Sequence, residues 1–360
     1  MADRPIRTIG ILGAGQLGRM LAVAASRLGL RTHVYAPDAD PIAAQVANAM
    51  TTAPYEDAGA LTEFADGVDV VTYEFENVPA EALDRLEAGR KLLPRRNALT
   101  ISQDRLVEKD FLNDVGLTTA PYANVETDDD VVEAAAAVGT PSIMKTRRLG
   151  YDGKGQVRLG RPEDAATAWA ELGKVPCIVE GVVAYRCEIS VIAARSPSGE
   201  VVCFEPGENV HRDGILRTTR VPASISDAER TEALRAASVI LERLDYVGVM
   251  GIELFVTPEG LAVNEIAPRV HNSGHWTQNG CVVDQFEQHI RSVAGWPLGD
   301  GRRHSDVEMT NLIGDDVLNV AELAGDPGLA LHVYGKADVR PGRKMGHVNR
   351  ITGPAAPSGT

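Results

Sequence analysis

Residues 251–280, GIELFVTPEGLAVNEIAPRVHNSGHWTQNG, constrain the fold more than any other part of this chain. Two β-rich runs, GIELFV and LAVNEI, flank the turn sequence TPEG, a pattern that predicts a β-hairpin. Folding about the glutamate of that turn sets Glu253 opposite Glu265, and Phe255 opposite Val263. Side chains alternate along a strand, so both carboxylates lie on one face with their Cβ atoms roughly 5 Å apart.

Two unpaired carboxylates at that distance repel, and one of them is driven to bind a proton. A shared Mg²⁺ ion removes the conflict, since it typically binds one or two carboxylates together with phosphate oxygens. The alternative is a pair of solvated glutamates on a surface hairpin. The next segment favours a ligand site, because it crowds polar and aromatic side chains together with little periodicity. These are Arg269, His271, Asn272, Ser273, His275, Trp276, Thr277, Gln278 and Asn279.

The composition bounds the class of protein. At 360 residues the chain is long enough for two or three domains, and 44% apolar with 24% charged residues is typical of a soluble protein. A net charge of −14 argues against a nucleic-acid partner. The four cysteines lack zinc-type spacing and are interpreted as reduced thiols. No stretch approaches about 18 apolar residues and the N-terminal run is too short for a signal peptide, so we expect a cytoplasmic protein without a membrane span.

The N-terminal region has the pattern of a phosphate-binding turn. Residues 6–12 predict a buried strand, and GAGQLG at 13–18 opens a predicted helix over about 17–28. A GxGxxG turn in this setting places an anion site at the helix N-terminus. Asp38 stands about where a dinucleotide-binding fold has its ribose-binding acid. The pattern alone fits an NAD-dependent oxidoreductase, or a doubly wound domain that binds another phosphate.

A third strand is predicted at 68–75 and ends in the sequence EFENVP. In open α/β sheets, ligands bind beyond the carboxyl ends of the strands, so Glu74 and Glu76 are candidates to contact a ribose or an amine, with Glu76 the better one. Alternatively, either acid caps the helix that follows. The sequence LLPRRNAL then indicates a domain boundary near residue 100.

A glycine-rich segment follows the strand PSIMK, which ends on Lys145. Its glycines and flanking cations predict a mobile flap over a polyphosphate, although it is not a Walker A loop and a surface turn is the alternative. The flap residues are Gly150, Tyr151, Asp152, Gly153, Lys154, Gly155 and Gln156. Residues 177–195 predict one strand, within which Glu180, Gly181, Val182 and Val183 resemble a hinge whose backbone could contact an adenine edge.

The C-terminal region carries a cluster of cations. Arg340, Arg343 and Lys344 surround a Pro-Gly turn, which fits a phosphate site in an acidic protein or, alternatively, solvated chain-end cations. Residues 351–360, ITGPAAPSGT, are predicted to be disordered.

These motifs together resemble the N5-carboxyaminoimidazole ribonucleotide synthetases, ATP-grasp ligases of purine synthesis. The resemblance rests on GILGAGQLGRML, YEFENVP, SQDRLVEKDFL, GYDGKGQ, HRDGILRTTRVP, NEIAPRVHNSGHWTQNG and RPGRKMGHVN, which follow the family's order over nearly the whole chain. It implies an α/β (α+β) ATP-grasp fold, usually paired as a homodimer. The implied domains are a Rossmann-like preATP-grasp domain at 1–100, an ATP-grasp domain at 101–295 and a small β-rich domain at 296–350.

The resemblance also implies roles for individual residues. Arg105 and Lys145 hold the ATP phosphates beneath the flap, and Glu253 and Glu265 carry Mg²⁺ or Mn²⁺. Other implied nucleotide contacts are adenine at Glu180–Val183, ribose at Glu188, and further contacts at His211, Asn264 and Glu265. The implied binding site for 5-aminoimidazole ribonucleotide, in place of NAD, consists of Gly15, Gln16, Leu17, Glu76, Arg343 and Lys344.

The implied reaction is the ATP- and bicarbonate-dependent carboxylation of 5-aminoimidazole ribonucleotide through carboxyphosphate, in de novo purine biosynthesis. Arg269 and His275 are assigned to the bicarbonate end, and Asp152 or His275 is the candidate general base. The nearest alternative is a formate-dependent glycinamide ribonucleotide transformylase, against which the sequence RVHNSGHWTQ speaks. An NAD-dependent oxidoreductase leaves the hairpin and flap without a role, and the intact set of predicted ligands argues against a catalytically silent nucleotide-binding module.

Overall fold

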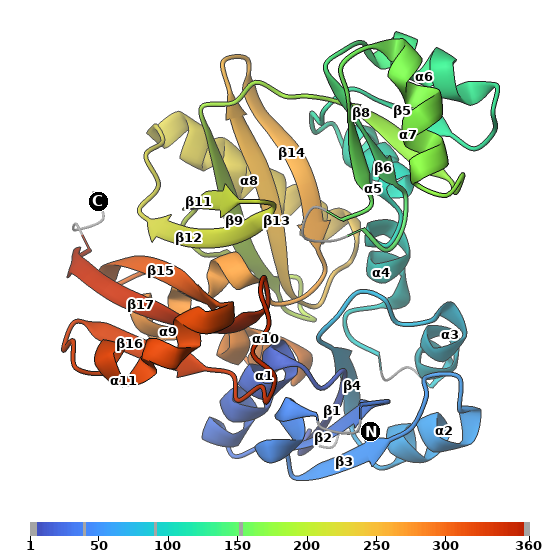
Figure 1. The fold of residues 1–360 in the computed structure, drawn as a ribbon. Helices are drawn as coiled ribbons and strands as arrows, with labels where there is room; N and C mark the ends of the chain where they lie inside the picture. Colours follow the sequence, from blue (N-terminus) through green and yellow to red (C-terminus); the bar gives the residue numbers. More distant parts are fainter. Residues whose placement is uncertain (1–5, 39–40, 90–91, 151–153, 356–360) are drawn as a thin grey trace.

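The computed structural model describes residues 6–38, 41–89, 92–150 and 154–355 and contains three sheets (Figure 1). The first is a parallel sheet of four strands in the order β3-β2-β1-β4. Its strands are β1 (Thr8–Leu12), β2 (Arg31–Ala36), β3 (Ala49–Thr52) and β4 (Val70–Tyr73), and its helices are α1 (Gln16–Arg27), α2 (Ala58–Asp66) and α3 (Ala80–Ala88). β1 and β4 are almost entirely buried, as expected of parallel strands covered on both faces.

Two helices, α4 (Arg96–Ser102) and α5 (Arg105–Asp114), lead from this domain to a small antiparallel sheet. Its order is β5-β8-β6-β7, and two helices pack against it. The elements are β5 (Tyr122–Val125), α6 (Asp130–Val138), β6 (Ser142–Thr146), β7 (Gln156–Leu159), α7 (Ala165–Glu171) and β8 (Cys177–Gly181).

The third sheet has nine strands, eight of them in the order β14-β13-β9-β11-β12-β15-β17-β16, with β10 paired to β9. Strands β15 to β17 of the C-terminal region join it through the antiparallel pair β12–β15, so one sheet runs through both regions. The strands are β9 (Cys187–Arg195), β10 (Val201–Cys203), β11 (Gly207–Arg212), β12 (Ile215–Val221), β13 (Gly248–Thr257), β14 (Gly260–Ala267), β15 (Ser305–Ile313), β16 (Leu329–Val333) and β17 (Lys344–Pro354). The accompanying helices are α8 (Asp227–Arg243), α9 (Thr277–Gly280), α10 (Gln285–Val293) and α11 (Val320–Leu323).

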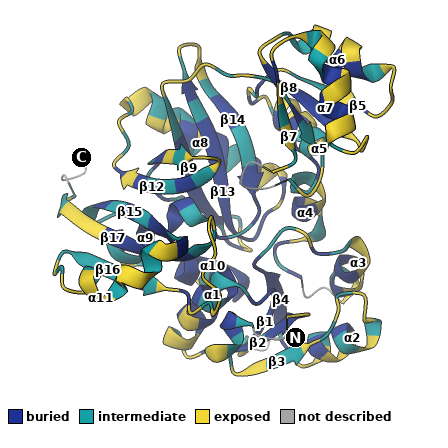
Figure 2. Cartoon of the chain, in the orientation of Figure 1, coloured by how far each residue is buried: buried dark blue, intermediate teal, exposed yellow. Residues whose placement is uncertain are grey.

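Helices α1 and α10 join the N-terminal domain to the large sheet. They pack against each other, and their apolar residues belong to one buried cluster that continues into β9, β13 and β15 (Figure 2). The Asp284 carboxylate caps α10 by accepting the Phe286 and Glu287 N–H groups, each at 2.9 Å. This packing fixes the glycine-rich turn ahead of α1 relative to the hairpin.

The predicted hairpin is confirmed as β13 and β14, and Glu253 lies opposite Glu265. The rest of the predicted register is wrong, since Phe255 pairs with Ala262 and Val263 pairs with Leu254. The turn lies at the predicted residues, but its centre falls between Pro258 and Glu259 instead of on Glu259, which shifts the pairing by one residue. A bulge at Asn264 then shifts the register back by one residue. The carboxylate pair therefore depends on that bulge.

Two further predictions need correction. Residues 177–195 do not form one strand, because β8 ends at Gly181 in the small sheet and β9 begins at Cys187 in the large one. The predicted disordered tail begins too early: residues 351–354 continue β17, whose backbone pairs with β15 despite a Gly- and Pro-rich composition. The four cysteines are free thiols, as predicted. Within the described residues, no helix is long and apolar enough to cross a membrane.

Candidate active site

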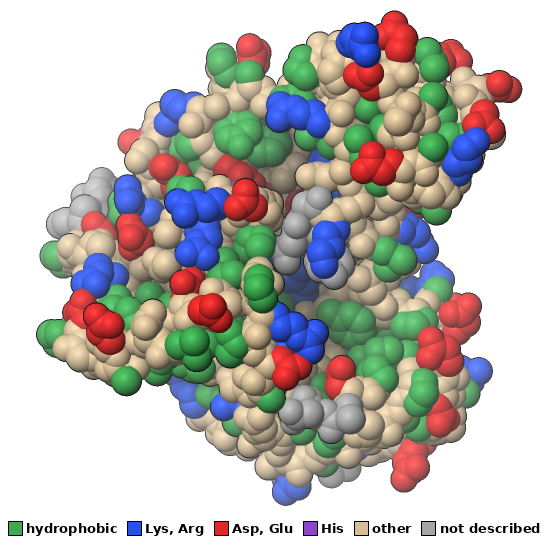
Figure 3. All heavy atoms as spheres, viewed as in Figure 1, with side chains coloured by type: hydrophobic (Ala, Val, Ile, Leu, Met, Phe, Trp, Pro, Cys, Tyr) green, Lys and Arg blue, Asp and Glu red, His purple; other side chains and the backbone are tan. Residues whose placement is uncertain are grey.

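A cavity of about 690 Å³ opens where the three sheets face one another, and Figure 3 shows this face hollowed near its centre. It brings together most of the residues that the sequence predicts for the site. These are Gly15, Gln16, Leu17, Glu76, Arg105, Lys145, Gly150, Lys154, Gln156, Glu188, His211, Glu253, Asn264, Glu265, Arg269, His275 and Lys344. Six predicted residues do not line it, namely Gly155, Glu180, Gly181, Val182, Val183 and Arg343. Tyr151, Asp152 and Gly153 lie outside the described residues.

The glycine-rich turn does not offer a vacant anion site, which corrects the sequence prediction. The buried Glu74 carboxylate accepts the Gly15 N–H at 2.6 Å and the Gly18 N–H at 2.8 Å. An internal carboxylate thus occupies the helix N-terminus where a dinucleotide pyrophosphate would bind. The turn still lines the cavity, but the NAD-dependent alternative has lost its phosphate site.

Two cations, Lys145 and Arg105, line the cavity, and each contacts a carboxylate. Lys145 Nζ lies 2.8 Å from Glu180 Oε2, and Lys109 Nζ lies 3.6 Å from the same oxygen. Burial disfavours the charged form of Glu180, but Lys145 and Lys109 outweigh it and leave its pKa below the ordinary value. The other oxygen, Glu180 Oε1, is buried and has no hydrogen-bond partner among the described residues.

Arg105 and Lys145 come from separate elements, and a bidentate ion pair joins those elements. Asp104 Oδ1 caps α5 by accepting the Leu106 N–H at 3.1 Å. The same carboxylate accepts Arg147 Nε at 2.9 Å and Nη2 at 2.7 Å, so the start of α5 is tied to the end of β6.

The hairpin glutamates have different neighbours. Glu265 Oε2 lies 3.2 Å from Arg105 Nη1. Although burial opposes ionisation, Arg105 and Lys145 keep the pKa of Glu265 below its ordinary value. Burial and the charges of Glu265 and Glu188 raise the pKa of Glu253. One carboxylate is therefore neutralised by an arginine, whereas the other lacks a matching charge and offers oxygen donors of the type Mg²⁺ prefers.

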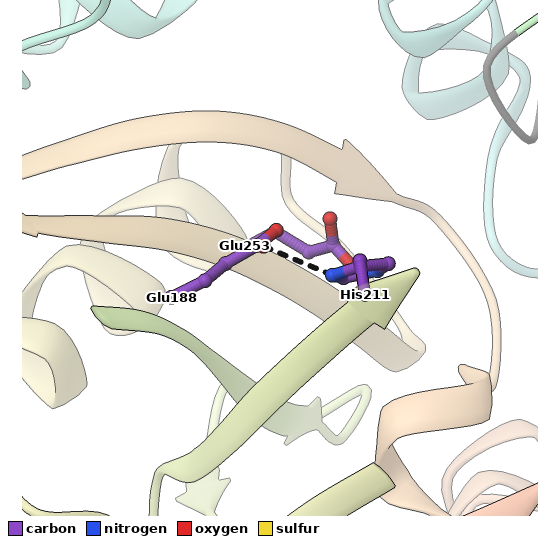
Figure 4. A group of neighbouring side chains, drawn as sticks. All are labelled: Glu188, His211 and Glu253. Carbon is purple, nitrogen blue, oxygen red and sulfur yellow. Dashed lines mark hydrogen bonds and ion pairs between the residues drawn. The ribbon is translucent and has the colours of Figure 1, made fainter. Parts of the chain in front are cut away.

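Glu253 also belongs to a second group of side chains. Glu188, His211 and Glu253 come from the adjacent strands β9, β11 and β13 and converge in the cavity (Figure 4). His211 Nδ1 lies 2.9 Å from Glu188 Oε2. Burial lowers the pKa of His211, but the Glu188 carboxylate outweighs it and the net shift is upward.

Arg269 and Glu76 lie on opposite sides of the domain junction and form an ion pair, with Nη2 2.7 Å from Oε1. His271 follows in the same loop, and its Nε2 lies 3.7 Å from Glu253 Oε1. The Ser273 N–H is directed at Nδ1 of His271, at 3.4 Å, and burial lowers the ring's pKa well below its ordinary value. The neutral ring then carries its proton on Nε2, facing the carboxylates.

His275 is unsuited to the predicted role of general base. Gln285 Oε1 accepts the His271 N–H at 2.9 Å, which fixes the amide so that Gln285 Nε2 donates to His275 Nδ1 at 3.0 Å. Burial keeps the pKa of His275 well below its ordinary value, so the neutral ring holds its proton on Nε2. His275 can donate a hydrogen bond to a ligand but has no free nitrogen to accept a proton.

Sequence reasoning missed several lining residues. Phe255 lines the cavity from β13, and its ring stacks on Tyr185 at a centroid distance of 4.6 Å. Phe255 could have been found, since it stands two residues after Glu253 and shares its face of the strand. His271 was visible in the polar run but carried no signal that separated it from His275. Arg343 donates to the Asp338 carbonyl at 2.9 Å, so Lys344 is the cation of that cluster that lines the cavity.

Three family models match the chain in order. They describe a ribonucleotide synthetase preATP-grasp domain at 6–103, an ATP-grasp domain at 110–286 and a phosphoribosylaminoimidazole carboxylase C-terminal domain at 308–356. The curated N5-carboxyaminoimidazole ribonucleotide synthase of Brucella melitensis is 53% identical over 351 residues, which cover 97% of each chain.

Solved structures agree with this relationship. The ADP complex of an N5-carboxyaminoimidazole ribonucleotide synthetase matches with a TM-score of 0.93 and 40% identity, covering 98% of this chain and 94% of that one. An Aspergillus clavatus N5-carboxyaminoimidazole synthase bound to ADP and 5-aminoimidazole ribonucleotide matches with a TM-score of 0.90 and 29% identity, covering 97% and 94%. The chain belongs to the N5-carboxyaminoimidazole ribonucleotide synthase family of ATP-grasp ligases.

Proposed function

We propose that this protein uses ATP and bicarbonate to carboxylate the exocyclic amine of 5-aminoimidazole ribonucleotide, in purine biosynthesis. The observation that carries this function is the single cavity that joins phosphate-binding cations, a pair of acidic metal ligands and the N-terminal turn. Family membership selects the reaction among those that ATP-grasp enzymes perform.

The nucleotide is assigned to the side of the cavity nearest the small sheet. Lys145 and Arg105 contact its phosphates; the buried Glu180 holds Lys145 in place, and the half-buried Glu265 holds Arg105. The predicted adenine contact at Glu180 is kept as a proposal: the residue does not line the cavity, but its Oε1 lacks a hydrogen-bond partner among the described residues. The stacked rings of Tyr185 and Phe255 supply a flat apolar surface beside it.

Glu253 and Glu265 are the residues that would hold Mg²⁺, and their oxygen donors and unbalanced charge fit this ion. When bound, the ion neutralises charge on the ATP phosphates. The chain's own contribution to phosphoryl transfer is positioning: Arg105 and Lys145 hold the γ-phosphoryl group while a bicarbonate oxygen attacks it.

Bicarbonate is assigned to Arg269, His271 and His275, where a guanidinium and two neutral N–H donors meet. Carboxyphosphate formed there breaks down to CO₂ and phosphate within the cavity, next to the amine it carboxylates. The ribonucleotide is assigned to the turn at Gly15–Leu17, with Lys344 near its phosphate. The base that takes the amine proton remains the predicted Asp152, and the homodimer also stays a prediction.

The test is ADP release in the presence of Mg-ATP, bicarbonate and 5-aminoimidazole ribonucleotide, with each component omitted in turn. We expect release to require the ribonucleotide and to increase with bicarbonate, and Glu265→Gln to abolish it. Release with glycinamide ribonucleotide and formate, and none with 5-aminoimidazole ribonucleotide, would overturn the proposal.

A further inference from the structure

Among the described residues, Glu188, His211 and Glu253 are the one group of three or more His, Cys, Asp or Glu side chains that could hold a metal ion. Each offers one ligand atom, and these atoms lie within 4.8 Å of one another. Figure 4 shows the three side chains directed at a common point. The group differs from the hairpin pair, because it excludes Glu265 and includes an imidazole.

The geometry is close to that of a bound ion. Ligands about 2.1 Å from a metal are about 3 to 4 Å from each other. The 2.9 Å contact between His211 Nδ1 and Glu188 Oε2 already has that spacing, so closing the site requires mainly a shift of Glu253. The side chains of Glu188 and His211 are only 11% and 26% exposed, which limits how far they can move apart.

The donor set decides which ions fit. Mg²⁺ takes oxygen ligands and retains several waters, whereas one imidazole nitrogen with two carboxylates suits borderline ions such as Mn²⁺ and Zn²⁺. Glu265 is not part of the group, and its carboxylate lies 3.2 Å from Arg105. Lys344 lines the same cavity, but its single charge is opposed by two carboxylates.

We propose that Glu188, His211 and Glu253 form a second divalent-cation site, filled by Mn²⁺ or Zn²⁺ in the nucleotide-free protein. Its occupation removes Glu188 and His211 from nucleotide binding, so the ion competes with ATP. The competition rests on the function proposed above, whereas the binding of the ion does not. The enzyme is therefore inhibited by borderline divalent ions at a site that shares Glu253 with the magnesium pair but takes its other two ligands from β9 and β11.

The test uses Mn²⁺ and the nucleotide-free full-length protein. Pulsed electron paramagnetic resonance should detect ¹⁴N coupling from a directly bound imidazole, and the coupling should disappear in His211→Asn. Replacing Glu188 by Gln should weaken Mn²⁺ binding at least about tenfold, because even outer-shell partners of metal ligands contribute that much. Circular dichroism checks that both variants fold.

Two histidines serve as controls. His304→Asn replaces an exposed ring that is hydrogen-bonded to Ser305, and it should leave the ¹⁴N coupling intact. His271→Asn should also retain it; coupling lost in His271→Asn but kept in His211→Asn would place the ion on Glu253 and His271 and overturn the proposal. Absence of ¹⁴N coupling in the unmodified protein would overturn it as well.

Adding ATP tests the competition. We expect the ¹⁴N coupling to vanish once nucleotide binds, as the bound Mn²⁺ moves to the phosphates and oxygen ligands. Calorimetry checks that the nucleotide has bound. If the ¹⁴N coupling persists in the nucleotide-bound protein, the competition is refuted. A failure of the proposed reaction would show instead as missing ADP release, with the Mn²⁺ spectrum unchanged.

Discussion

Replacing Glu180 by Gln tests whether buried charges hold the nucleotide side of the site. The change keeps the shape of the side chain but removes the carboxylate shared by Lys145 and Lys109. Lys145 is 15% exposed and can turn toward solvent, whereas Lys109, at 2%, cannot. Breaking a buried pair from one side costs about 3–5 kcal/mol, and because one of the two lysines can rehydrate we expect about 3 kcal/mol.

Deprotonation of Lys109 limits the destabilisation that Glu180→Gln can cause. Burial already lowers the pKa of Lys109, although Glu180 and Glu108 counteract it. Without Glu180 the ammonium can release its proton and avoid the full penalty of an unpaired buried charge.

Hydrogen exchange followed by mass spectrometry is the assay, because the loss should concentrate in the small sheet. A loss of about 3 kcal/mol raises the equilibrium for opening β6 and β8 about 100-fold, and their amides should exchange faster by that factor. Asp128→Asn is the matched control, since it removes an ion pair with Lys174 whose side chains are 77% and 56% exposed. Exchange in Glu180→Gln within about threefold of the control would refute the reasoning.

Four other perturbations have defined outcomes. Glu74→Ala leaves the partly buried Gly15 N–H and the buried Gly18 N–H without an acceptor and should cost about 2–4 kcal/mol in urea denaturation; an unchanged midpoint would contradict it. Ser226→Ala removes the cap of α8 and should cost about 1 kcal/mol in the same assay, whereas a stabilised variant would be inconsistent with the cap. Gly251→Ala places a Cβ 2.6 Å from His271 Cβ, so the ring must shift, and both ADP release and the thermal midpoint should fall; full activity would argue against a role for that ring. Burial and neighbouring acids raise the pKa of Glu253 to about 8, and because the ion binds the carboxylate, Mg²⁺ affinity measured by calorimetry should rise from about pH 7 to pH 9; affinity that stays constant would exclude Glu253 as a ligand.

The sequence predicted the cross-strand glutamates for an incomplete reason. Alternation along the strands placed Glu253 and Glu265 on one face, but the strands fold about a point between Pro258 and Glu259 and not about Glu259, so their register differs by one residue. The bulge at Asn264 restores their pairing, and a bulge leaves no periodic signal in a single sequence. The sequence therefore predicted that Glu253 and Glu265 pair, but not the bulge that makes them pair.

The role of Glu74 was beyond sequence reasoning for a different reason. A glycine-rich turn indicates that an anion binds, but the pattern does not distinguish a ligand from a carboxylate of the same chain. The tautomer of His275 similarly depends on Gln285, which lies ten residues away and contacts it only in the folded state. Long-range hydrogen bonds of this kind decide which polar residue acts on a ligand and which supports the fold.

The large sheet carries residues assigned to both substrates. Glu253, Glu188 and His211 lie on the neighbouring strands β13, β9 and β11, and Lys344 begins β17 farther along the same sheet. Backbone hydrogen bonds therefore set the separation between Glu188 and Lys344, one contact assigned to each substrate, while the small sheet joins the rest through residues 115–121 and 182–186. A bisubstrate inhibitor for this protein can accordingly use a rigid linker, because the two ends it must reach stand on one continuous framework.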